Sequence, residues 1–346
     1  MLKLSNQKKT LIIISLIIVL VLSIAICLTL GSAQLSLGQV VKAVLKRIPL
    51  VGERLGYSVS PMDDLIIHSI RLPRILLAIL VGCALGAAGV VFQGVFHNPM
   101  AEPFVIGVSS GAALGATIAF VLGLNFSFFG LSSVPIMAFL GSMLTTFVVY
   151  NIARVGRKVP LTVLLLAGVA VGSFMSALNS LLMVFNREES TKIVFWLMGG
   201  FSARGWEHVQ AAFPYILIGY LVIVFYLEEL NLLSLGEEKA QLMGVDVEKV
   251  QLILIGAASL IAAAAVSVSG IIGFVGLIVP HIIRILIGPD HKFLLPTATI
   301  FGGIFLLWTD TLARTVFSPI EVPVGILTSM AGAPFFVYLL RKNRYK

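Results

Sequence analysis

Long, charge-free apolar runs recur from one end of this sequence to the other. A helix that crosses the roughly 30 Å of membrane hydrocarbon needs about 20 mostly apolar residues. Five runs clearly reach that length, and they cover residues 11–30, 75–96, 159–185, 209–227 and 322–340. The chain is therefore predicted to be an integral membrane protein built from transmembrane helices.

The remaining apolar stretches divide at turn residues. The stretch 103–153 has no charge and is too long for one span, and the turn residues between Gly123 and Ser133 split it into two. A second stretch, 250–287, is split by Ser269 and Gly270, and residues 293–309 supply one more span. The sum is an all-α integral membrane protein with about ten transmembrane helices.

The scarcity of charge excludes other classes of protein. Of the 346 residues, 58% are hydrophobic and 12% are charged, which is about half the roughly 25% charge of soluble domains. So few charged residues cannot coat a soluble protein of this length, and a soluble cytosolic or secreted protein is excluded. The net charge is +8, but the basic residues are spread between apolar runs, so nucleic-acid binding is not expected.

An even number of spans places both chain ends on one side of the membrane. Lys and Arg are enriched in short cytoplasmic loops, and more of them fall on the side of the termini than on the other, so both termini are predicted to be cytoplasmic. A cleaved signal peptide is the alternative, since a basic start precedes the first apolar run. Signal cores are about 7–15 residues long, and this longer run favours a retained first helix.

Small residues and prolines inside the spans bear on helix packing. Three glycine pairs have a spacing of four residues: Gly82 and Gly86, Gly111 and Gly115, and Gly168 and Gly172. Such pairs allow close helix approach and predict a tightly packed bundle. Five prolines lie in or beside spans: Pro99, Pro103, Pro280, Pro296 and Pro334. They indicate either broken helices along a translocation path or ordinary kinks.

The sequence carries no enzymatic motif. The His-Glu-x-x-His zinc helix, the Gly-x-Ser-x-Gly elbow and the ATPase phosphate loop are all absent. Cys27 and Cys83 are interpreted as small core residues. We expect no catalytic residue, no metal and no cofactor, and any ATP-driven work must come from another subunit. The span centres lack ionisable groups, which disfavours a proton-coupled carrier, while sodium coupling stays open.

The segment 228–249 is acidic, whereas the other loops predicted on the cytoplasmic side are short and basic. Leu235, Ala240 and Met243 alternate with charged residues at helical spacing, and two glycines interrupt the segment. Glycine commonly follows the last turn of a helix, so two short helices outside the membrane are predicted. They form either a docking surface for a soluble partner or a solvated connector, and the residues alone slightly favour the connector.

A series of motifs runs from about residue 65 to the C-terminus. They are RLPR at 71–74, Gln93 with NPMAEP at 98–103, GVSSG at 107–111, LLAGVA at 165–170, WLMGG at 196–200, LGE at 235–237, GFVGLIVPHIIR at 273–284 and EVPVG at 321–325. In this order they resemble the FecCD-type permease family, the membrane subunits of type II ABC importers for iron–siderophore complexes, haem and cobalamin. We predict one polytopic transmembrane domain over residues 1–346. The resemblance covers residues 65–346, and residues 1–64 are expected to form a first helix and a long outer loop.

The resemblance implies a transport subunit, not an enzyme, in the cell membrane of a prokaryote. Two permeases, expected to be a homodimer, surround a central path within membrane lipid. Two separate ATPase subunits lie inside, and an extracytoplasmic binding protein delivers the cargo outside. The implied cargo is an iron complex, with an iron–siderophore ahead of haem or cobalamin. A stand-alone secondary transporter is the alternative.

The resemblance also assigns docking residues. Arginines at the outer mouth of the family receive acidic residues of the binding protein, and the matching positions are Arg71, Arg74 and Arg314. Helix-end anchoring is the alternative for all three. For Arg314 an internal pair with Asp310, four residues earlier, is another.

On the inner side the resemblance replaces the connector interpretation of 228–249 with a coupling element seated in the ATPase. Its implied contact residues are Leu235, Gly236, Glu237, Ala240, Leu242 and Gly244. The inner gate is expected at Leu161 and Thr162, of which only Thr162 keeps the small hydroxyl character that is common in the family.

Overall fold

The computed structural model of the chain is almost entirely helical, and it describes residues 5–343 except 32, 34, 48–58, 129 and 157. Seven described helices are long and apolar enough to cross a membrane: α1 (Asn6–Thr29), α5 (Leu72–Val95), α7 (Ser133–Ala153), α8 (Leu161–Phe185), α10 (Trp206–Phe225), α13 (Val247–Ser269) and α15 (His291–Thr315). Two shorter apolar helices are α6 (Val108–Val121) and α14 (Val275–Ile287), and a third is the apolar part, Val324–Tyr338, of α16 (Val324–Asn343). The predicted all-α fold with about ten spans is confirmed.

The other elements are short. They are α2 (Leu37–Lys46), α4 (Pro61–Leu65), the π-helical turn η1 (Ile66–Arg71), the 3-10 turn η2 (Pro103–Ile106), α9 (Arg187–Leu197), α11 (Leu227–Leu233), α12 (Glu237–Leu242), β1 (Ser127–Phe128) and β2 (Leu131–Ser132). The strands β1 and β2 pair antiparallel as a small hairpin, with Ser127 opposite Ser132. The elements α4, η1 and α5 form one continuous helical run.

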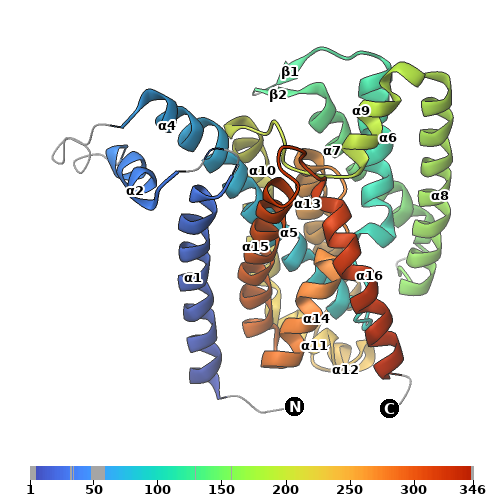
Figure 1. Cartoon of the computed structure of the whole chain (residues 1–346). Coiled ribbons are helices and arrows are strands. Elements are labelled where there is room, and N and C mark those ends of the chain that lie inside the picture. The colour runs from blue at the N-terminus through green and yellow to red at the C-terminus, as the bar shows by residue number, and fades with distance from the viewer. Residues whose placement is uncertain are drawn as a thin grey trace.

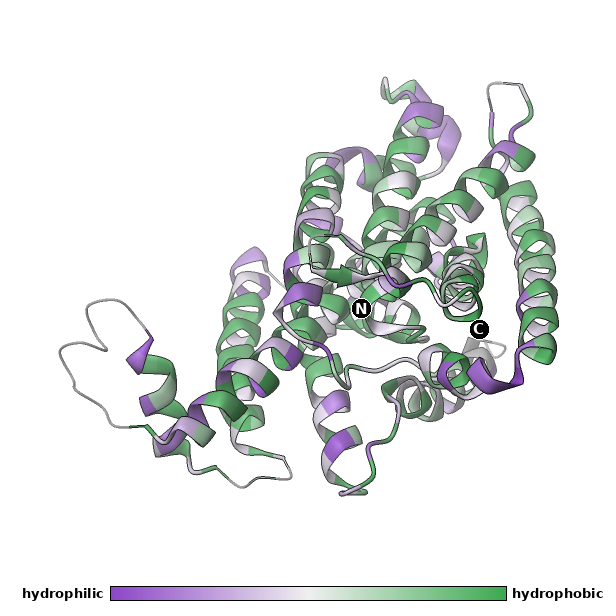
Figure 2. Ribbon diagram, turned by 90° about the horizontal axis from the view of Figure 1, so that it is seen from above, coloured by the Kyte–Doolittle hydropathy of each residue, from purple (hydrophilic) through white to green (hydrophobic). Residues whose placement is uncertain are grey.

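The short elements define two ends of the bundle (Figure 1). The α9 end carries α2, α4, α9 and the β1–β2 hairpin, and the α12 end carries α11 and α12. The start of α1 and the end of α16 both lie at the α12 end, as an even number of spans predicts. Figure 2 shows that hydrophobic residues cover most of the helices, while hydrophilic residues gather in connections and short helices.

The centre of the bundle is α5, with α13, α14 and α15 packed against it. Most residues of these central helices are buried. In contrast, α1 and α8 stand at opposite edges of the molecule (Figure 1), and most of their residues are exposed. Helices that are apolar around their whole circumference are stable in lipid or against another apolar surface, so these edges are suited to a membrane.

Glycine allows the closest helix contacts, as the spaced pairs predict. A Cβ atom at Gly82 would lie 2.2 Å from the backbone oxygen of Gly302, so only glycine lets α5 and α15 meet here. Four further members of the predicted pairs, Gly86, Gly111, Gly115 and Gly168, are pressed against backbone in the same way. Gly172 is the exception, since its nearest neighbour is the Ser110 hydroxyl at 3.5 Å.

The prolines divide into two groups. Pro99 and Pro103 lie in a non-helical break between α5 and α6, which includes η2. Pro280, Pro296 and Pro334 lie inside α14, α15 and α16, and these helices continue through them. The expectation of broken helices therefore holds at the first two prolines only.

Candidate functional site

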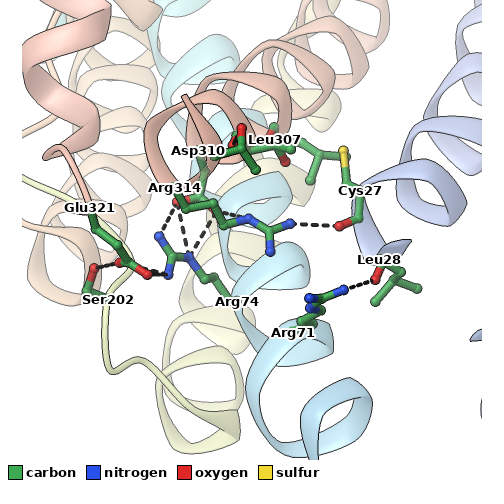
Figure 3. A network of polar contacts seen from close by, with 11 residues as sticks. Cys27, Leu28, Arg71, Arg74, Ser202, Leu307, Asp310, Arg314 and Glu321 are labelled. Atoms are coloured by element: carbon green, nitrogen blue, oxygen red, sulfur yellow. Dashed lines mark hydrogen bonds and ion pairs between the residues drawn. The ribbon is translucent and has the colours of Figure 1, made fainter. Parts of the chain in front are cut away.

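The three arginines singled out in the sequence meet at the α9 end of the bundle (Figure 3). Arg71 ends η1, Arg74 lies in the first turn of α5, and Arg314 lies in the last turn of α15. Residues three apart on a helix share a face, which brings Arg71 and Arg74 together. We call these arginines with Asp310 and Glu321 the arginine cluster.

Arg74 is the centre of the arginine cluster because both edges of its guanidinium are occupied. Its Nε donates to Asp310 Oδ2 at 3.0 Å, and its Nη2 donates to Asp310 Oδ1 at 2.9 Å. Its Nη1 donates to both carboxylate oxygens of Glu321 at 3.0 Å. Bidentate arginine–carboxylate pairs are among the stronger polar contacts in proteins. Arg74 thus joins α5 to α15 and to the connection that precedes α16.

Arg71 and Arg314 bind main-chain oxygens near the end of α1 (Figure 3). Nη1 of Arg71 donates to Leu28 O at 2.6 Å, and its Nη2 donates to Ala33 O. Nη2 of Arg314 donates to Cys27 O at 2.7 Å. The last carbonyls of a helix lack intrahelical partners and carry partial negative charge, so both arginines cap α1. Arg314 Nε lies 3.9 Å from Asp310 Oδ2, a looser contact than the pair of Asp310 with Arg74.

Glu321 links the arginine cluster to a neighbouring turn. Its carboxylate accepts a hydrogen bond from the Ser202 hydroxyl, in the connection between α9 and α10. Partial burial raises the pKa of Glu321, but the Ser202 hydrogen bond and the positive charge of Arg74 together lower it below its ordinary value. The carboxylate is therefore held in its charged form beside Arg74.

A cavity of about 390 Å³ lies beside this turn. Its wall includes Glu321 and Ser202, together with the charged residues Lys192 and Arg204 and the aromatic ring of Trp196. The backbone nitrogen of Gly325 donates to Gly199 O at 3.4 Å, which holds the start of α16 against the same turn. The cavity and the arginine cluster thus share Glu321.

The α12 end carries the two short helices predicted in the segment 228–249. Gly236 precedes α12 with a φ of +111°, and Gly244 follows it with a φ of +88°. Both values lie where residues other than glycine are strained. No atom lies within 4 Å of a Cβ built at either glycine, so the backbone angle, and not space, requires glycine.

Contacts with the bundle fix α11 and α12 in place. Leu230 and Leu233 of α11 are fully buried, as is Ala240 of α12. Gln251 of α13 donates to the Glu237 carboxylate at 2.9 Å, and Asn231 donates to Asp290 at 3.1 Å. These short helices are therefore seated firmly on α13 and on the start of α15.

Exposed apolar side chains flank α12 at its two ends. Leu235 precedes the helix, Leu242 ends it with 88% of its surface accessible, and Met243 follows it, while the helix itself exposes mainly charged and polar residues. Of the six predicted contact residues, Leu235 and Leu242 can meet a partner directly. Ala240 instead packs inward, Glu237 is bonded to Gln251, and the two glycines shape the backbone.

The two residues predicted at an inner gate begin α8. Thr162 is exposed, while Leu161 is partly buried against the main core. They are not brought together with either the arginine cluster or the cavity beside it, because α8 stands at the edge of the molecule (Figure 1).

Sequence reasoning missed two residues at the arginine cluster, Glu321 and its hydrogen-bond partner Ser202. Glu321 carried a signal, because it is the only acidic residue after Asp310 and it opens the EVPVG motif. Nothing in the sequence pointed to Ser202, because a serine in a turn does not indicate a hydrogen-bond partner 119 positions away.

Comparisons with known proteins identify the family and the fold. The model of the FecCD transport family matches residues 17–342. The chain is 45% identical over 297 residues to the cobalamin import system permease protein BtuC of Halobacterium salinarum, covering 84% of this chain and 78% of the relative. It is 40% identical over 278 residues to the hemin transport system permease protein HmuU of Yersinia pestis, covering 80% and 83%.

A solved structure also matches. It is described as an inward-facing conformation of an ABC transporter assigned to the metal-chelate type. It superposes with a TM-score of 0.80 at 34% identity, over 96% of this chain and 99% of that chain.

Proposed function

The chain belongs to the FecCD transport family, and we propose that it forms the translocation path for an iron complex delivered by an extracytoplasmic binding protein. It is the permease of a metal-chelate-type ABC importer and a multi-pass protein of the prokaryotic plasma membrane. It is a transport component, and a separate subunit supplies the ATPase. The stand-alone secondary transporter is not favoured.

For the cargo, the proposal places an iron–siderophore first and haem or cobalamin second. One relative is named for cobalamin and another for hemin, and hemin is itself an iron chelate. All three candidates are large metal chelates of the same general kind, so a permease of one fold can serve any of them.

For orientation, the α12 end faces the cytoplasm and the α9 end faces outward, with both termini cytoplasmic. Two ATPase subunits bind at the α12 end of a permease homodimer. The start of α8, at Leu161 and Thr162, forms the inner gate. The binding protein docks at the α9 end with its acidic residues toward Arg71, Arg74 and Arg314. Of these, Arg71 and Arg314 are buried against the end of α1 and act through their charge. Such charged contacts fix orientation and speed encounter more than they add affinity.

The observation that carries this proposal is the set of exposed apolar residues at the two ends of α12. Leu235, Leu242 and Met243 are exposed, while Ala240 and the Gln251–Glu237 hydrogen bond hold the helix against the bundle. Exposed apolar residues of this kind, rimmed by the acidic residues of 228–249, are typical of a surface that a soluble partner covers. An ATPase subunit docked here would move the bundle through Gln251 and α13.

Reconstitution tests the proposal. The permease, its ATPase and its binding protein are placed in proteoliposomes, and uptake of radiolabelled ferric siderophore, hemin and cyanocobalamin is measured with and without ATP. We expect ATP-dependent uptake of the ferric siderophore that requires all three proteins. Uptake by the permease alone, driven by a sodium gradient, would contradict the importer and support a secondary carrier. ATP-dependent uptake of hemin or cyanocobalamin alone would correct the cargo and leave the mechanism standing.

A further inference from the structure

The members of the arginine cluster differ in their access to solvent. The Asp310 side chain is 0% exposed and the Arg74 side chain 11%, whereas the Glu321 side chain is 43% exposed. Asp310 is fixed inside α15, while Glu321 lies in the connection between α15 and α16. A molecule that approaches from the α9 end therefore meets Glu321 first, and Arg74 lies behind it.

Within the arginine cluster, the ion-paired residues Arg74, Arg314, Asp310 and Glu321 supply two positive and two negative charges. Arg71 adds a third positive charge, and its guanidinium binds main-chain oxygens. All three guanidinium nitrogens of Arg74 already donate to carboxylates. A further carboxylate can bind Arg74 only where one of the present two gives way, and the buried Asp310 is the less replaceable of them.

We propose that Glu321 is an exchangeable internal ligand of Arg74, displaced by a carboxylate of the docked binding protein. The inference rests on the proposed function, because it presumes that a binding protein docks at the arginine cluster. The exchange replaces one charge-assisted carboxylate contact at Nη1 of Arg74 by another. Arg74 keeps two carboxylate partners throughout, and its buried charge is never left alone.

The exchange also changes the wall of the neighbouring cavity. Glu321 holds Ser202 through a hydrogen bond, and both residues line the cavity of about 390 Å³. When Arg74 releases Glu321, the tie between the turn at Ser202 and helix α5 is lost. Docking at the arginine cluster is thereby linked to the shape of the cavity, through one side chain that belongs to both.

The test measures docking of the purified cognate binding protein to the permease–ATPase complex in nanodiscs, by interferometry at low and at physiological salt. Glu321→Gln keeps the shape of the side chain and removes its charge. Residue 321 then competes less strongly with the carboxylate of the binding protein for Arg74. We expect docking about tenfold tighter than with the wild type, since a neutral contact is roughly half as strong as a charge-assisted one. Ser202→Ala removes only the support of Glu321, and we expect a smaller gain of about twofold.

Glu189→Gln is the matched control. It removes an acidic charge from α9, at the same end of the bundle, but Glu189 pairs with Lys192 and not with Arg74. Any general attraction for an acidic partner appears equally in both variants and fades with salt. A gain specific to Glu321→Gln that persists at physiological salt supports the exchange.

Two results would overturn the inference. The first is an affinity of the binding protein for Glu321→Gln that is equal to or weaker than its affinity for the Glu189→Gln control. Glu321 would then be either a permanent structural partner of Arg74 or a direct contact of the binding protein. Absence of docking by the wild-type complex under all conditions would overturn the docking assignment itself, and the exchange with it. Unfolding midpoints and ATPase assembly of each variant identify any loss of fold.

Discussion

The Asp310 side chain has no access to solvent, and its main ion pair is with Arg74. Removing one member of a buried ion pair leaves the other charge uncompensated, which costs about 3 kcal/mol or more. Asp310→Asn keeps the size of the side chain and removes its charge. We expect a clear fall in the thermal unfolding midpoint of the purified permease in detergent.

The control for that substitution is Glu189→Gln, which breaks an exposed pair with Lys192. Exposed pairs at this helical spacing contribute about 0.5 kcal/mol or less, so its midpoint should barely move. Equal shifts in the two variants would show that the Arg74–Asp310 contact adds no more stability than a surface pair.

At the scale of single residues, the sequence predicted which arginines matter but not which residues they bind. Arg71, Arg74 and Arg314 could be singled out from their motifs and from their positions at helix ends. Their partners could not, because Asp310 lies 236 positions from Arg74 and Glu321 lies 247. Charge alone does not fix such long-range pairs, since they depend on how α5 and α15 pack.

At the scale of the elements, the short helix α12 is shaped by the glycine that follows it. Gly244 has a φ of +88°, where a β-branched residue is strongly disfavoured and costs about 1–2 kcal/mol. Gly244→Val is therefore expected to distort the end of α12 beside Leu242, and to lower the transport achieved per ATP hydrolysed by roughly tenfold. The measurement is cargo uptake and ATPase rate in the same proteoliposomes.

Gly244→Asn is the matched variant, because asparagine tolerates this backbone region far better than valine. It should retain most of the coupling between ATP hydrolysis and transport. Wild-type transport by Gly244→Val would argue against a coupling role for the segment.

The elements themselves were largely predictable. Apolar length and turn residues located the seven long helices and the three shorter apolar ones that the structure describes, because lipid requires every backbone group to be bonded within its own helix. The predicted Ser269–Gly270 division falls at the end of α13. The prolines were harder to interpret. Pro280, Pro296 and Pro334 all sit inside continuous helices, since neighbouring helices and local adjustment can satisfy the freed carbonyls.

The whole molecule presents more apolar surface at its edges than one chain can cover. The edge helix α8 exposes Leu166, Val169 and Phe174 along its length, in keeping with a second permease or lipid at this edge. We predict that the importer assembles as two permeases with two ATPase subunits. Native mass spectrometry of the complex released from detergent should give this ratio, and a complex with a single permease would contradict the homodimer.

The caps on α1 have a consequence for how the chain is made. The carbonyl of Cys27 is bonded by Arg314, which follows it by 287 positions. Helix α1 can complete this contact only after α15 has been synthesised and inserted. During translation α1 must therefore stay in the bilayer on its own hydrophobicity. A helix that is made early in this chain thus gains its cap from one of the last helices to be made.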